Sequence, residues 1–148
     1  MWAASRHRLP AESPWRTVGS GRSGVVALAP VSDLAWCYER ALGGQAAGAL
    51  MGGGPDEFPE RYREADPAGL LPAGVPVRLV HGTADDRVPS EMSLSYAARA
   101  LAAGDHDTEC VLLPGAGHFD VIDPLSAAWP QVVAAFRYTQ ESVHRAGP

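Results

Sequence analysis

The stretch VPVRLVHGTADDRVP, residues 75–89, joins a short apolar run to a polar loop. The run, Val75–Val80, is rich in valine and ends at His81-Gly82, which is the composition and punctuation of a buried β-strand. The loop places Asp85 five residues beyond Val80. A carboxylate just past a parallel strand lies at the edge where open α/β sheets form their binding sites. The stretch therefore predicts both a strand and a candidate site.

Two further runs, Val25–Ala29 and Thr108–Leu113, have the same β-type composition, and segments of helical period alternate with the three runs. One helix is expected over Ser90–Ala103, with Ser90 as its capping residue and Gly104 just past its end. Strands that alternate with helices favour a parallel sheet. We therefore predict the α/β class, with three parallel strands and flanking helices.

The final helix is expected to start at Asp123 as N-cap with Pro124 in the first helical position, although Pro130 allows a later start. Residues 34–71 are less regular and predict an excursion that forms one wall of a pocket. The chain divides into an N-terminal segment (1–24), the main body (25–137) and a tail (138–148) that loses helical periodicity.

Composition excludes several classes of protein. The net charge is −5, with acidic and basic residues interspersed over 148 residues, so a nucleic-acid partner is not expected. No apolar run approaches the roughly 20 residues of a membrane span. Cys37 and Cys110 lie far apart and outside any ligand spacing, and the histidines and carboxylates also lack one, so neither a metal nor a cofactor is expected.

A second loop, Gly115-Ala116-Gly117-His118-Phe119, follows the third run and places His118 five residues beyond Leu113. An acid after one strand and a histidine after the next is the chain order of the acid and base in α/β-hydrolases. In a Ser-His-Asp site the acid orients the imidazole, and the imidazole moves the proton of the nucleophile. Asp85 and His118 are therefore the candidate catalytic residues.

These two loops resemble the acid and histidine loops of the α/β-hydrolase superfamily, above all the prolyl-oligopeptidase-like serine hydrolases and the esterases related to kynurenine formamidase and feruloyl esterase. The resemblance covers about Val25 to Phe136 and includes Ala29-Pro30-Val31-Ser32-Asp33-Leu34. It implies a partial α/β-hydrolase fold. It also implies hydrolysis of an ester, amide or peptide bond in a small-molecule or peptide substrate, through an acyl-enzyme.

The nucleophile elbow of that superfamily, G-x-S-x-G after a strand, is missing from the sequence. The first ten residues resemble the end of the helix that follows the nucleophile in those enzymes. We therefore expect a C-terminal part of a cytoplasmic hydrolase that is inactive alone. Without its neighbour, the first strand is expected to expose an apolar edge that favours self-association.

Two other functions remain open. One is a complete small hydrolase that recruits Ser20, Ser23 or Ser32, although no strand precedes Ser23 as an elbow requires. The other is a non-catalytic binding module on a hydrolase scaffold. The letters G-x-G-x-x-G at residues 19–24 precede a strand instead of following one, so we do not interpret them as a dinucleotide site.

The remaining polar residues have structural interpretations. His81 is expected to hydrogen-bond locally at the strand end, Asp33 to cap the following helix, and Asp86 to pair with Arg87. Surface positions are expected for three further histidines, His7, His106 and His144.

Overall fold

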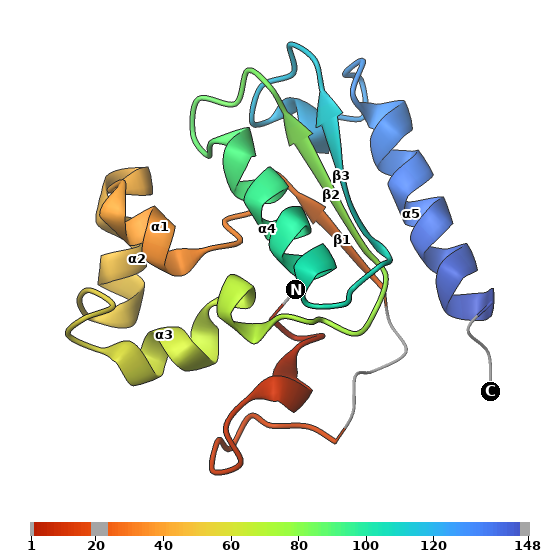
Figure 1. Cartoon of the computed structure of the whole chain (residues 1–148). Helices are drawn as coiled ribbons and strands as arrows, with labels where there is room; N and C mark the ends of the chain where they lie inside the picture. Colours follow the sequence, from red (N-terminus) through yellow and green to blue (C-terminus); the bar gives the residue numbers. More distant parts are fainter. Residues whose placement is uncertain (1, 19–23, 146–148) are drawn as a thin grey trace.

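Three parallel strands form one sheet in the order β1-β2-β3 in the computed structural model, which describes residues 2–18 and 24–145 (Figure 1). The strands are β1 (Val25–Leu28), β2 (Val77–Gly82) and β3 (Thr108–Leu113). The helical elements are η1 (Arg6–Arg8), α1 (Leu34–Glu39), α2 (Leu42–Met51), α3 (Pro59–Ala65), η2 (Pro67–Leu70), α4 (Ser90–Ala102), η3 (Asp120–Ile122) and α5 (Trp129–Arg145). The predicted α/β class is confirmed.

The central strand β2 is buried along its whole length because helices cover both faces of the sheet, α4 on one and α5 on the other (Figure 1). Side chains of a strand alternate between the two faces. Val77 and Leu79 accordingly pack with Tyr96 of α4, whereas Val80 packs with Val132 of α5. This alternation decides which helix each polar residue of β2 meets.

Helix α5 takes the later of the two starts that the sequence allowed, and its end differs from the prediction. It begins at Trp129 instead of Asp123, and Pro130 lies in its first turn, where a missing N–H costs nothing. Asp123 instead accepts the N–H of Leu125 at 2.9 Å in a turn. The helix also continues through Arg145, with the small polar residues Thr139 and Ser142 buried. A prediction from sequence periodicity treats such polar residues as exposed. Thr139 can be buried because its hydroxyl donates to the Ala135 carbonyl at 2.8 Å.

Other boundaries follow local chemistry. Asp33 caps α1 as predicted, since its carboxylate accepts the Trp36 N–H at 2.8 Å. Ser90 was expected to cap α4, but it is the first helical residue and makes no capping bond. The first residues resemble the end of an α-helix in sequence. From Trp2 they instead form turns and the short 3₁₀ element η1, in which the Arg8 N–H donates to the Ser5 carbonyl at 2.8 Å, three residues back.

The excursion, residues 34–71, contains α1, α2, α3 and η2 and lies beside α4 (Figure 1). The buried carboxylate of Asp66 accepts the N–H groups of Leu34 at 3.1 Å and Ala68 at 3.2 Å, and so ties the two ends of the excursion together. Asp33 pairs with Arg99 of α4 at 2.9 Å. None of the described helices is long and apolar enough to cross a bilayer.

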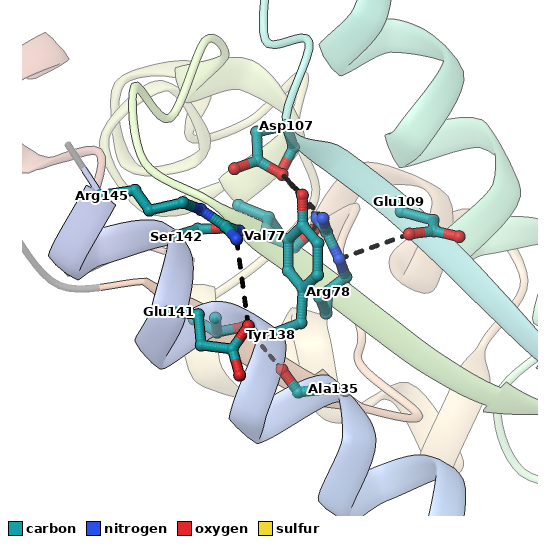
Figure 2. Close-up of polar contacts among 10 residues, drawn as sticks. Val77, Arg78, Asp107, Glu109, Ala135, Tyr138, Glu141, Ser142 and Arg145 are labelled. Carbon is teal, nitrogen blue, oxygen red and sulfur yellow. Dashed lines mark hydrogen bonds and ion pairs between the residues drawn. The ribbon is translucent and has the colours of Figure 1, made fainter.

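On the opposite face, Arg78 of β2 joins the sheet to α5 (Figure 2). Its guanidinium stacks 3.7 Å from the ring centroid of Tyr138 and pairs with Asp107 at 2.7 Å and Glu109 at 3.4 Å. It also donates to the Val77 and Asp107 carbonyls, each at 2.9 Å. Only 6% of the Arg78 side chain is exposed, so this cluster is a structural clamp.

Replacing Arg78 with alanine is expected to lower the free energy of unfolding by about 2 kcal/mol, because charge-assisted hydrogen bonds and the stacking on Tyr138 are lost together. Tyr138→Phe keeps the ring and loses only the hydroxyl bond to Asp107, so about 0.5 kcal/mol is expected. Urea denaturation of the two variants measures the difference. If Arg78→Ala were as stable as the unaltered chain, the clamp would not be needed for stability.

Candidate active site

The loops after β2 and β3 lie at the same edge of the sheet, because parallel strands end side by side (Figure 1). Nδ1 of His118 lies 2.7 Å from Oδ2 of Asp85, although the two residues are 33 positions apart. The structure therefore brings together the two residues that the sequence predicted as acid and base.

The Asp85 carboxylate is held on both of its oxygens. Oδ1 accepts the backbone N–H groups of Arg87 and Val88, each at 2.8 Å, while Oδ2 faces His118. The Asp85 side chain is fully buried, whereas 25% of the His118 side chain is exposed. No described residue hydrogen-bonds to Nε2 of His118. This edge of the ring is the one that a general base needs free.

Backbone contacts fasten the two loops to each other. The Thr83 N–H donates to the Leu113 carbonyl at 3.0 Å, and the Ala84 N–H donates to the Ala116 carbonyl at 3.0 Å. The Gly115 N–H also donates to Oγ1 of Thr83 at 2.9 Å. The acid loop and the histidine loop thus continue the sheet pairing past its last residues and form one unit.

Burial on its own raises the pKa of the Asp85 carboxyl, but hydrogen bonds from the Val88 N–H, the His118 ring and the Arg87 N–H outweigh it. The net effect is a pKa below the ordinary value. The folded protein therefore favours the ionised acid, and an ionised acid fixes the tautomer of His118 with its proton on Nδ1.

This shift predicts a pH-dependent stability. Because the pKa of Asp85 is lower in the folded than in the unfolded chain, its stabilising contribution is fully present above about pH 4 and is lost as the pH falls through the folded pKa. The difference in unfolding free energy between the unaltered chain and Asp85→Asn should shrink below about pH 4. Urea titrations between about pH 3 and 7 measure it; a constant difference would contradict the prediction.

The surface next to the acid loop has a pocket of about 260 Å³, lined by Leu42 of the excursion together with Thr83, Arg87 and other residues of the loop. A larger pocket, of about 650 Å³, runs along β3 and is lined by residues 111–116 and by Asp120. Neither His118 nor the Asp85 loop lines the larger pocket. The excursion thus contributes to the wall beside the acid, as its position in the sequence predicted.

The remaining predicted residues have structural partners. His81 is fully buried and hydrogen-bonds locally, to Oγ of Ser93 at 2.7 Å and to the Val88 carbonyl at 3.0 Å. Asp86 pairs with Arg87 at 3.4 Å. Sequence analysis did not single out Ser93. Its place on the same side of the helix as the apolar residue Tyr96, three residues later, could have indicated that it is buried. Exposed surface positions are confirmed for His106 and His144, whereas His7 is half-buried.

Of the three serines considered as substitute nucleophiles, the structure describes Ser32. Ser32 is fully buried, and its hydroxyl donates to the Met92 carbonyl at 3.2 Å. Ser20 and Ser23, with most of the glycine motif at 19–24, lie outside the described residues. Within residues 2–18 and 24–145, no group of three or more His, Cys, Asp or Glu side chains is placed to hold a metal ion.

Comparisons with known proteins identify the family of the chain. Residues 23–139 match the prolyl oligopeptidase family. The esterase LipC of Mycobacterium tuberculosis is 37% identical over 70 residues, which cover 46% of this chain and 17% of LipC. The crystal structure of a dipeptidyl aminopeptidase IV-like protein of Bacteroides ovatus superimposes with a TM-score of 0.58 at 19% identity, over 83% of this chain and 16% of that one.

The chain thus spans 17% and 16% of the lengths of these two relatives, and the structural likeness shows a shared fold. The family match covers most of the sequence, including both loops of the site. On this basis the chain belongs to the prolyl oligopeptidase family, a family of hydrolases within the α/β-hydrolase superfamily.

Proposed function

We propose that the chain supplies the acid and the base of a Ser-His-Asp site that hydrolyses ester, amide or peptide bonds. Asp85 orients the imidazole of His118 and stabilises its positive form. His118 accepts the nucleophile's proton at Nε2 and then donates it to the leaving group. The serine and the donors that stabilise the oxyanion come from a segment outside these 148 residues.

The observation that carries the proposal is the 2.7 Å contact between Nδ1 of His118 and Oδ2 of the buried Asp85. A carboxylate beside Nδ1 leaves the lone pair on Nε2, and Nε2 is the atom that must face a serine hydroxyl. The partial exposure of His118 lets a second segment reach that atom. Both properties fit proton transfer better than a packing role.

The described serine that contacts a histidine ring does not compete as a nucleophile. Ser93 lies 2.7 Å from Nδ1 of His81, but both side chains are fully buried. A nucleophile must reach the carbonyl carbon of a substrate, so a hydroxyl closed off on every side cannot attack it. The proposal therefore assigns no nucleophile to the described residues.

The chain alone is accordingly expected to hydrolyse an unactivated alkyl ester, which an imidazole does not attack by itself, no faster than its His118→Ala variant, because no described hydroxyl group hydrogen-bonds to Nε2 of His118. Stopped assays with equal protein concentrations measure both rates. His106→Ala is the matched control, since it removes an exposed histidine far from the acid loop in sequence. Activity that disappears only in His118→Ala would show that the chain recruits a nucleophile of its own.

The proposal is tested by providing the missing hydroxyl. Residues 24–145 are placed behind the nucleophile-bearing part of a prolyl oligopeptidase-family enzyme, in place of that enzyme's own final segment, and ester hydrolysis is measured. We expect a fluorophosphonate to label the serine only when His118 and Asp85 are present. A folded chimaera whose serine reacts equally well without them would refute the assigned roles.

A further inference from the structure

A second histidine, His81, contacts the same carboxylate oxygen of Asp85 as His118 does. The ring of His81, near the end of β2, is fully buried. Its Nε2 lies 3.1 Å from Oδ2 of Asp85 and 3.0 Å from the Val88 carbonyl, and its Nδ1 lies 2.7 Å from Oγ of Ser93. Oδ2 of Asp85 therefore has two imidazole nitrogens near it, Nε2 of His81 at 3.1 Å and Nδ1 of His118 at 2.7 Å.

The partners of the His81 ring fix its tautomer. Nε2 faces two oxygen atoms that only accept hydrogen bonds, so Nε2 carries a proton. Nδ1 then accepts from the hydroxyl of Ser93, which is able to donate. In this arrangement every polar atom of the buried ring has a partner, as burial requires.

We infer that His81 is a positioning residue, which holds the Asp85 carboxylate in the orientation that receives the His118 N–H. The inference rests on the proposed function, because it gives Asp85 the role of the acid. Two backbone N–H groups hold Oδ1, and the N–H edge of His81 lies beside Oδ2. Rotation of the carboxylate would break contacts on both oxygens.

The same ring also fixes the loop that carries the acid. Val88 donates its N–H to Asp85 at 2.8 Å, and its carbonyl receives the N–H of His81 at 3.0 Å. Both the N–H and the carbonyl of Val88 are therefore hydrogen-bonded, and they fix the end of the segment from Asp85 to Val88. Ser93 connects this arrangement to α4, whose buried face supports the ring.

A purely structural histidine fills space, whereas a positioning histidine must present an N–H at Nε2. Two substitutions separate these roles. The amide nitrogen of His81→Gln reaches about as far as Nε2, so it keeps a donor near Asp85 and Val88. The shorter amide of His81→Asn reaches only the position of Nδ1, so it keeps the contact with Ser93 and loses the donor to the acid.

The readout is the Nδ1 proton of His118 in NMR spectra of the chain, since a proton shared with a buried carboxylate resonates far downfield and exchanges slowly. We expect this signal in the unaltered chain and in His81→Gln. In His81→Asn we expect its exchange to accelerate by about tenfold or more, the factor that corresponds to one charge-assisted hydrogen bond. An unchanged signal in folded His81→Asn, or equal acceleration in both variants, would overturn the inference.

Two controls keep the test decisive. Nitrogen chemical shifts of the unaltered chain report the His81 tautomer without any substitution; a proton on Nδ1 with none on Nε2 would overturn the inference even if His81→Asn failed to fold. Asp85→Asn should abolish the slow exchange of the His118 proton. If it did not, the Asp85–His118 pair itself, and with it the proposed function, would fail, independently of the result for His81.

Discussion

In an enzyme assembled from this chain and a nucleophile-bearing segment, replacing His118 with alanine is expected to lower kcat by a factor of about 10⁶. Without the imidazole, the serine hydroxyl has no base to accept its proton, and the leaving group has no acid to protonate it. Substrate binding does not use the ring, so KM should change little. The loss therefore lies in the chemical step.

Replacing Asp85 with asparagine should cost about 10⁴ in kcat, less than the loss of His118, because the ring remains but its proton is no longer fixed on Nδ1. Asp86→Asn is the matched control. Asp86 is the next residue in the chain and its side chain is 78% exposed. Among the described residues it pairs with Arg87 alone, so its replacement should leave kcat unchanged.

These rates are measured with a p-nitrophenyl ester, after titration of the reactive serine to correct for the active fraction. Equal losses in Asp85→Asn and Asp86→Asn would show that the 2.7 Å contact with His118 has no part in the reaction. If an assembled, folded protein hydrolysed no ester even with Asp85 and His118 intact, yet bound a ligand equally well with both replaced, the binding-module interpretation would take the place of the hydrolase.

The parts of the fold that the sequence predicted are those where local pattern and tertiary packing agree. Strand β3 occupies Thr108–Leu113, the range that its composition indicated. Asp85 and His118 were predictable because each follows its own strand, and parallel pairing brings the two strand ends together. Here sequence order and spatial proximity carry the same information.

The parts that the sequence did not predict depend on contacts between distant segments. Burial of Thr139 and Ser142 on α5 depends on what lies beneath the helix, so their polarity misleads a pattern-based prediction. The contact between His81 and Ser93 joins a strand to a helix across 12 residues, and neither residue indicates it alone. Such contacts become visible only when packing is known.

Gly82, the last residue of β2, lies against Ala116 of the histidine loop. Glycine has no Cβ, and a Cβ added at Gly82 would collide with the carbonyl oxygen of Ala116. That oxygen accepts the Ala84 N–H at 3.0 Å, so the collision would fall on a bond that fastens the two loops. Backbone atoms cannot rotate away as a flexible side chain can.

Gly82→Ala is therefore expected to lower the free energy of unfolding by about 3 kcal/mol, at the upper end of the range for overpacking, because one loop must shift. Gly117→Ala, in the histidine loop that Gly82 lies against, is the control. Among the described residues, its added methyl would meet Oδ2 of Asp120 alone, at an ordinary contact distance of 3.6 Å, so a change below about 0.5 kcal/mol is expected. Since the shift separates Asp85 from His118, Gly82→Ala should also lose the slowly exchanging His118 proton, whereas Gly117→Ala should keep it. Urea denaturation measures the stability, and NMR measures the exchange of the His118 proton. A stable Gly82→Ala variant that keeps this slowly exchanging proton would mean that the loops can separate at Ala116 without disturbing the acid–base pair.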